Sequence, residues 1–460
     1  MRTAASATSA TYTTTATATA AAATAATAAT AATADLLPPT QRPAEEAPPW
    51  ALRRLRLAEA ALHACFWLSW PAAAALLAVW GAADDGGSAS SLLLALGLAT
   101  AAVCAVQLVL YLTTALLAVV PSLQGLLAFG HPCKYFSALQ TAGPFDTGAR
   151  LLGRRDVSRP ACAGLAHARN VRLRTRDGES LGAWHVLPSG GAARRAAARV
   201  AAGEAEGDVF DAALREEGGG AGGDSGDSGA GGLRAAIYLH GMGEMRTKWV
   251  ATEHAKWISA QLGLHVLLPD YRGFADSSGS PSEQGLCADA AAALEWLNQR
   301  GVRSDEVLLW CHSLGTGVGA QLARECQQVG APLGGLVLEG AYTSLGAAAA
   351  QHPAGLVFRA LPGGAALVRR LFAFGFSTVD VLPSLTLPTL LLHGTHDVMV
   401  PVTHADALAA AAGAPDAPCA ARLRLVRLRG VGHLHTIFQP QLLAVVDAWL
   451  REVVAPAVRT

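Results

Sequence analysis

The stretch EVLLWCHSLGTGVGAQ, Glu306 to Gln321, decides the fold of this chain. Its first half, Val307 to Trp310, predicts a short buried strand, and the small residues Gly315 to Gly317 open a helix. Ser313 lies between the two, with Cys311 two positions before it. A strand that turns so sharply into a helix presents one side chain at the edge of a sheet, and the positions two before and two after that side chain must be small.

This is the pattern of a nucleophile elbow, G-x-S-x-G, with Cys311 in place of the first glycine. Because cysteine is a small residue, we expect the turn to form with slight crowding. The N-terminus of the helix directs backbone N–H groups at Ser313, where they would stabilise an oxyanion. The alternative is that Ser313 only caps the helix, a position that serine often occupies.

Strands and helices alternate along the rest of the chain. The predicted strands are Ala235–Leu239, Leu264–Pro269, Gly335–Glu339, Pro388–His393 and Leu423–Leu428, and the predicted helices are Glu253–Leu262, Glu283–Arg300 and Leu442–Val453. Before them, two strands at 171–176 and 181–187 flank a turn at Asp177-Gly178, a frequent hairpin signal. The alternation predicts an α/β fold, with a mostly parallel, doubly wound sheet and helices on both faces.

A serine becomes nucleophilic when a base removes its proton, and the base needs an orienting acid. In a fold with a nucleophile elbow, the acid and the histidine follow the serine in that order. Asp397 comes directly after a predicted strand, and His433 follows the last strand in the sequence GVGH. We therefore predict a catalytic triad of Ser313, Asp397 and His433. The backbone amides of Leu314 and Met242, the latter in the loop HGMG after an early strand, are the predicted oxyanion hole.

Several other polar residues compete for these roles. His435 is the main rival of His433, which we prefer because the glycines beside it let the loop fold over the serine. His396 precedes the last strand, and Asp270 precedes the serine, so that Asp270 is expected to be structural and to hold the DYRG turn. His240 is expected to brace its own loop. No role is assigned to His352 or His404.

Composition narrows the classes of function. The 35 basic and 35 acidic residues balance, and no basic block indicates a nucleic-acid partner. No C-x-x-C pair occurs, so zinc or thioredoxin-like chemistry is not expected, and neither a metal nor a cofactor is predicted. The eight cysteines are scattered, and several fall inside predicted strands or helices, which suits reduced, buried thiols; they are Cys65, Cys104, Cys133, Cys162, Cys287, Cys311, Cys326 and Cys419.

The N-terminal part has a different character. Residues 1–49 form an Ala/Thr tract followed by a Pro-rich piece, and this composition predicts disorder. Within the predicted membrane region, 50–125, the segments 60–83 and 91–120 are uncharged and exceed the roughly 20 apolar residues of a transmembrane helix. Basic residues flank both outer ends, which predicts a hairpin with the following domain in the cytosol. The alternative is a pair of buried core helices; if only one segment spans, the domain lies on the other side.

The globular domain is predicted at 160–455. It contains a disordered insertion at 189–232, whose end is rich in glycine, and a lid at 346–377. The lid mixes apolar residues with Arg359, Arg369 and Arg370, which suits a surface facing lipid headgroups. A helical pair packed on the core is the alternative.

The chain resembles the α/β-hydrolase superfamily and, more narrowly, the abhydrolase domain-containing lysophosphatidylserine and monoacylglycerol lipases. The resemblance runs across roughly residues 165 to 455, without the glycine-rich insertion. The matching pieces are LGAWHVLP (181–188), YLHG (238–241), PDYRGFADSSGSPSEQG (269–285), HSLGTGV (312–318), HPAGLVFRALPG (352–363) and the acid loop HGTHDVMVP (393–401). The departures are Cys311, Ala275 where the family has glycine after DYRG, and two predicted spans where close members have one.

The resemblance implies a membrane-anchored serine hydrolase that cleaves the acyl ester of a single-chain lipid through an acyl-enzyme, with Ser313, Asp397 and His433 as its triad. Endoplasmic reticulum or another endomembrane is the expected location, the bilayer and a lipid ester are the expected partners, and no obligate protein partner is inferred. Two alternatives stay open. One is a thioesterase that removes palmitate from proteins, or a serine peptidase; the other is a catalytically inactive scaffold, to which Cys311 points.

Overall fold

The structure is a computed structural model that describes residues 94–109 except 103 and 107, together with 157–216, 232–352, 363–371, 375–414 and 416–455. Its strands are β1 Ala168–Arg174, β2 Ser180–Val186, β3 Ala235–Leu239, β4 His265–Pro269, β5 Val307–His312, β6 Gly335–Glu339, β7 Thr389–Gly394 and β8 Leu423–Leu428. Its principal helices are α6 Gly191–Ala201, α7 Glu206–Glu216, α8 Trp249–Trp257, α9 Glu283–Asn298, α10 Leu314–Gln328, α11 Leu345–Gln351, α13 Gly364–Leu371, α14 Thr378–Val381, α15 Thr403–Ala412 and α16 Leu442–Trp449.

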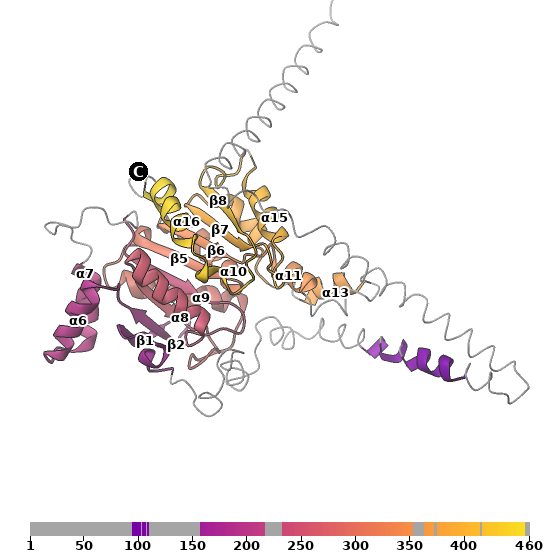
Figure 1. Ribbon diagram of the computed structural model, residues 1–460, viewed down its shortest axis with the longest axis horizontal. Coiled ribbons are helices and arrows are strands. Elements are labelled where there is room, and N and C mark those ends of the chain that lie inside the picture. The colour runs from indigo at the N-terminus through magenta and orange to yellow at the C-terminus, as the bar shows by residue number, and fades with distance from the viewer. Residues whose placement is uncertain are drawn as a thin grey trace, which may run out of the picture. The chain divides into compact units, whose positions relative to one another are not determined.

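The described strands form one eight-stranded sheet in the order β1-β2-β4-β3-β5-β6-β7-β8 (Figure 1). The β1–β2 hairpin is antiparallel, and β2 also runs antiparallel to β4, whereas β3 to β8 pair in parallel. Asp177-Gly178 forms the hairpin turn, with Gly178 at a φ of 92°. The mostly parallel α/β sheet predicted from the sequence is confirmed.

Strand positions agree closely with the sequence, because each strand is a short apolar run bounded by turn residues. The predicted ranges of β3, β6 and β8 are reproduced. The ends of the other strands shift by at most two residues, except that β1 begins at Ala168, three residues before its predicted start. Helix α8 begins at Trp249, four residues earlier than expected, and passes at Ile258 into a π-helical turn that ends at Leu262.

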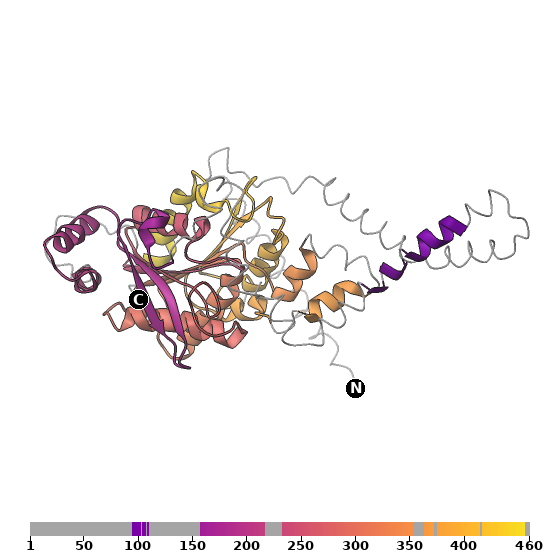
Figure 2. The same cartoon turned by 90° about the horizontal axis from the view of Figure 1, so that it is seen from below.

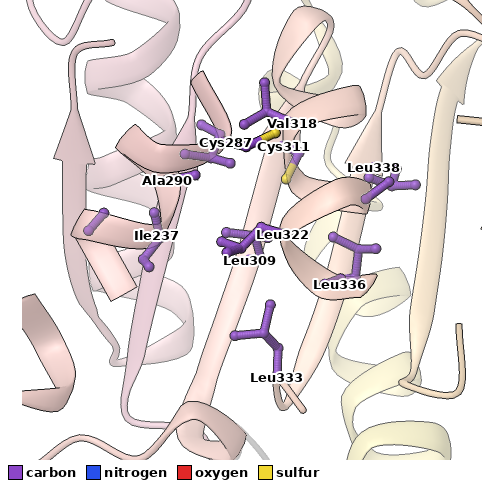
Figure 3. Close-up of a cluster of buried hydrophobic side chains, with 14 of the residues drawn as sticks. Ile237, Cys287, Ala290, Leu309, Cys311, Val318, Leu322, Leu333, Leu336 and Leu338 are labelled. Carbon is purple, nitrogen blue, oxygen red and sulfur yellow. The ribbon is translucent and has the colours of Figure 1, made fainter. Parts of the chain in front are cut away.

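Two apolar clusters sandwich the sheet. On one face, side chains of α9, α10 and α15 cover β3, β5 and β6, and this cluster includes Leu309, Leu322 and Leu336. Figure 3 shows Cys311 in this cluster, near Cys287 and Val318. On the other face, α8 and α16 pack on the same strands. The parallel strands are therefore buried on both faces, which explains why they are continuously hydrophobic.

The predicted disorder of 189–232 is wrong for the part that the structure describes. This segment forms the helices α6 and α7, which lie beside each other (Figure 2). Val209 and Phe210 of α7 pack with Leu187 and Ala196. The Arg169 guanidinium of β1 forms an ion pair with Asp211 and lies 5.1 Å from the ring centroid of Phe210. Alanine-rich composition suggested a loose loop, but these apolar and paired side chains anchor the helices to the sheet. Residues 217–231 lie outside the described part.

The predicted membrane segment 60–83 lies wholly outside the described residues, as does the tail 1–49. Of the second segment, 91–120, the residues described between 94 and 109 are helical. Within the described ranges no helix combines the length and apolar character needed to cross a bilayer. The membrane region therefore stays a prediction.

Both edges of the sheet carry arginine. The edge strand β1 has Arg169, Arg172 and Arg174, and the opposite edge strand β8 has Arg424 and Arg427. On β8, Arg424 forms an ion pair with Glu452 and Arg427 with Asp406, 2.7 Å away. These pairs are substantially exposed.

Candidate active site

Ser313 lies between β5 and α10 in a backbone conformation that L-residues seldom adopt, with φ 51° and ψ −116°. Its N–H donates to the Glu339 carbonyl at 2.9 Å, so the neighbouring strand β6 holds the turn. The Ser313 side chain makes no capping hydrogen bond to α10. The simple N-cap interpretation is therefore wrong, and the hydroxyl stays available at a strained position, as in a nucleophile elbow.

Two glycines show how tightly the elbow is packed. A Cβ at Gly315 would lie 2.2 Å from the Leu239 carbonyl oxygen at the end of β3, so only glycine fits there. A Cβ at Gly319, on the next turn of α10, would lie 2.1 Å from Cys311 Sγ. The fully buried Cys311 side chain thus occupies space that Gly319 leaves open. The replacement of the first elbow glycine is accommodated by a glycine in the helix.

His433 and Asp397 meet at the C-terminal ends of the strands. His433 Nδ1 donates to Asp397 Oδ2 at 2.6 Å. Their loops are joined where the His396 N–H donates to the Val431 carbonyl at 2.9 Å. Gly340, just after β6, leaves room for the imidazole, since a Cβ there would lie 2.9 Å from His433 Cε1. Because Glu339 binds the Ser313 amide, this glycine brings His433 beside the elbow.

The surroundings of Asp397 favour its charged form. Asp397 Oδ1 accepts backbone hydrogen bonds from Met399 at 2.9 Å and Val400 at 2.8 Å. Burial alone would raise the pKa of Asp397, but contacts with His393 and His433 and the Val400 amide outweigh burial and lower the pKa below its ordinary range. Asp397 is therefore a buried carboxylate that can orient the ring of His433.

The rival residues lie elsewhere. The His435 ring packs 6.2 Å from Trp249, and His396 is exposed. His240 is buried, with Nδ1 2.9 Å from the Gly241 carbonyl, so it braces its loop as expected. Asp270 is structural but binds elsewhere than predicted: it accepts from the Arg246 amide at 2.6 Å and forms an ion pair with the Arg246 guanidinium, holding the β3 loop.

The loop after β3 approaches the serine. A Cβ at Gly241 would lie 3.1 Å from Ser313 Cβ, so this loop closes over the elbow. Met242 follows, and Leu314 is the first residue of α10, whose N–H has no acceptor within its own helix. Among the described residues, no group of three or more His, Cys, Asp or Glu side chains is arranged to hold a metal ion.

Comparison with known proteins agrees with this geometry. The profile of the family described as alpha/beta hydrolase fold matches residues 237–368, which include the elbow and the loop after β3. This part of the chain is therefore similar to proteins of the α/β-hydrolase fold.

Some curated proteins to which this chain is similar are named as lysophosphatidylserine lipases, and one has a name that states no activity. The lysophosphatidylserine lipase ABHD12 of Danio rerio is 31% identical over 253 residues, covering 54% of this chain and 59% of the relative. Protein ABHD12B of Homo sapiens is 32% identical over 258 residues, covering 54% and 63%. The chain therefore matches about three fifths of the length of these relatives. A solved esterase of Pyrococcus furiosus aligns with a TM-score of 0.44 and 17% identity, covering 64% of this chain and 94% of the esterase.

Two buried residues that were not selected from the sequence join the candidate active site. Glu244 Oε2 accepts from the Gly241 N–H at 3.0 Å, and Glu244 Oε1 lies 3.1 Å from His312 Nδ1 in an ion pair. His312 Nε2 lies 3.1 Å from the His433 carbonyl oxygen. In the sequence, these two residues are marked only by their positions, since Glu244 follows Gly241 by three residues and His312 directly precedes Ser313. No sequence pattern indicates that Glu244 and His312 contact each other.

The two residues influence each other's charge. Burial would lower the pKa of His312, but the Glu244 carboxylate outweighs burial and raises the pKa to about 9. Burial would raise the pKa of Glu244, but the His312 imidazolium lowers it to about 2. Each residue thus shifts the pKa of the other in the direction that favours the charged form of both.

Proposed function

We propose that this protein is a serine hydrolase that cleaves acyl esters of single-chain lipids, either monoacylglycerol or a lysophospholipid. The observation that carries the proposal is the 2.6 Å contact between His433 and the buried carboxylate Asp397, beside the strained Ser313. The likeness to lysophosphatidylserine lipases supports a lipid ester as substrate.

The mechanism has two steps. Because Asp397 accepts from Nδ1, the other ring nitrogen of His433 is left to take the proton of Ser313, which attacks the ester carbonyl carbon. The amides of Leu314 and Met242 stabilise the oxyanion. His433 then protonates the leaving alcohol, and water, activated by His433 in turn, cleaves the acyl-enzyme.

The lid and the membrane region complete the proposal. Helices α11 and α13 lie in the segment 346–377, and the exposed Arg369 of α13 suits contact with headgroup phosphates. The uncharged segments 60–83 and 91–120 anchor the domain to an endomembrane, with the active site in the cytosol if both insert. Retention in the membrane pellet after alkaline carbonate extraction tests the anchor; release into the supernatant would contradict it.

The decisive experiment is labelling of the full chain in detergent with a fluorophosphonate probe. We expect the wild type to be labelled and Ser313→Ala to lose labelling by a factor of about 10³ or more. Labelling that persists in Ser313→Ala would mean that another serine reacts, and a folded wild type that stays unlabelled would favour the inactive scaffold. Against that scaffold, Gly319 relieves the crowding at Cys311 that was its sequence support.

Substrate class is tested next, on the same preparation. We expect hydrolysis of monoacylglycerol or lysophosphatidylserine that Ser313→Ala lacks. A palmitoylated peptide serves as the competing substrate for the thioesterase alternative. Faster release of palmitate from the peptide than of fatty acid from either lipid would replace the proposed substrate.

A further inference from the structure

His312 lies between two oxygen atoms that can accept a hydrogen bond. Its Nε2 is hydrogen-bonded to the His433 carbonyl oxygen at 3.1 Å, whereas its Nδ1 lies 3.1 Å from Glu244 Oε1 in an ion-pair contact that does not have hydrogen-bond geometry. The His312 side chain is fully buried, and that of Glu244 is 7% exposed, so water does not screen the pair. A neutral imidazole carries one hydrogen and could donate to only one of these acceptors; the other nitrogen would then set its lone pair against an acceptor oxygen.

We infer that His312 is held as an imidazolium and acts as a positioning residue, a charged clamp that ties the loop of the base His433 to the oxyanion loop through Glu244. The inference rests on the function proposed above. His312 and Glu244 are positioning residues because neither is assigned a contact with substrate.

The clamp joins three segments that must meet for the reaction. Glu244 Oε2 accepts from Gly241, the residue before the proposed oxyanion donor Met242. His312 adjoins Ser313 in the chain, and its ring centroid lies 4.9 Å from that of His433. A Cβ at Gly241 would lie 3.1 Å from Glu244 Oε1, His312 Nδ1 and Ser313 Cβ alike, so the three segments converge on one point.

Other titratable groups also face His312. The buried Glu339 of β6 is hydrogen-bonded to His254 of α8 at 2.9 Å, and the His254 ring lies 6.2 Å from that of His312. His240 in the β3 loop and His433 complete this surrounding set. Only Glu244 contacts His312 directly as a carboxylate, so a change at Glu244 acts first on the proton of His312.

The test measures the rate of fluorophosphonate labelling of the full chain from pH 6 to 10. The variants are His312→Gln, whose amide does not titrate and can still donate near the position of Nε2, and Glu244→Gln, which keeps an acceptor for the Gly241 amide without the charge. Glu253→Gln removes a partly exposed carboxylate that pairs with Lys256 on α8 and serves as the matched control.

At pH 7.5 we expect Glu244→Gln to slow labelling by about 10- to 100-fold, as misplaced reacting groups do, and Glu253→Gln to leave it unchanged. The ratio of the wild-type rate to the His312→Gln rate should fall as pH rises through about 9, where His312 loses its proton. In Glu244→Gln the alkaline loss should move to lower pH, because the counter-ion is gone. A rate ratio that stays constant from pH 6 to 10 would overturn the clamp, since a merely structural histidine gives that result.

Melting temperature supplies a second readout that needs no activity. A group whose pKa is raised in the folded state stabilises the protein fully below its unfolded pKa, near 6.5, and loses this contribution as pH rises through about 9. The melting difference between wild type and His312→Gln should therefore shrink between these values. If it shrinks while no variant labels, the catalytic proposal fails and the charged pair stands; if it does not shrink, the imidazolium is refuted.

Discussion

Ser313 in the elbow and Ala275 in the turn after β4 share a positive φ. Among the described residues these are the two non-glycine positions with positive φ, 51° and 47°. A sparsely populated backbone region of this kind costs an L-residue about 1–3 kcal/mol. At Ser313 the strain presents a hydroxyl at the point where the loops of Gly241, Asp397 and His433 converge. At Ala275 the strain presents only a methyl group.

Anchors on both sides explain why the turn at Ala275 tolerates this strain. The Ser277 N–H donates to the Phe274 carbonyl, and the Ser277 hydroxyl donates to the Asp270 carbonyl at 2.8 Å. Asp276 forms an ion pair with the buried Arg246 at 2.8 Å. The turn is fixed by its neighbours whichever residue stands at 275. The comparison shows two uses of a positive φ. In the elbow it presents the hydroxyl of Ser313, whereas in the turn at Ala275 it only lets the chain change direction.

Replacing Ser313 by glycine separates strain from chemistry and has the largest expected effect. We expect Ser313→Gly to lower labelling by about 10⁴-fold or more, while the free energy of unfolding rises by up to about 1 kcal/mol because glycine accepts positive φ. Chemical denaturation beside labelling measures both. Ser282→Gly is the matched control: this serine caps α9 at a φ of −152°, so it should lose a few tenths of a kcal/mol and keep labelling. A destabilised Ser313→Gly would show that the elbow is not strained.

Filling the space opposite Cys311 tests the packing of the elbow. We expect Gly319→Ala to lower the free energy of unfolding by about 1–3 kcal/mol, because its Cβ would collide with Cys311 Sγ. The double variant Cys311→Gly with Gly319→Ala should recover most of this loss. Gly207→Ala in α7, whose nearest atom would lie 3.8 Å away, should be neutral or stabilising. If the losses in free energy of unfolding of the two single variants simply added in the double variant, Gly319 would not compensate for Cys311.

Relieving the turn is the smallest change. Ala275→Gly should raise the free energy of unfolding by about 1 kcal/mol and leave the labelling rate unchanged, since no reacting group lies there. Urea denaturation and labelling of the same preparation measure these quantities. Slower labelling in this variant would mean that the turn contributes to the site, and the contrast between the two strained positions would no longer hold.

Local sequence patterns predicted the features that depend on nearby residues. The apolar runs gave the strands, and the order of Ser313, Asp397 and His433 gave a set of residues of which the last two are in contact in the structure. The departure at Ala275 was visible as an alanine where the pattern of the resembled family has glycine, and the positive φ of Ala275 is a conformation that glycine adopts without strain.

Features that depend on distant packing could not be predicted. The pairing of Glu244 with His312 joins residues 68 positions apart in sequence. The space left by Gly319 is apparent only when helix and strand are packed together. The helices α6 and α7 were missed because alanine and glycine dominated the composition, although Val209, Phe210 and Leu214 carried an apolar signal.

The arginines at both edges of the sheet bear on how copies of this molecule meet. An edge strand offers unpaired backbone groups to another strand, and charged side chains discourage such pairing. On β1 the side chains of Arg172 and Arg174 are exposed, and on β8 that of Arg427 is exposed, whereas Arg169 is buried beside Asp211. A strand that approached either edge would therefore meet long charged side chains, most of them already paired with carboxylates. Ordering and desolvating these pairs against another copy disfavours the addition of a strand at both ends of the sheet.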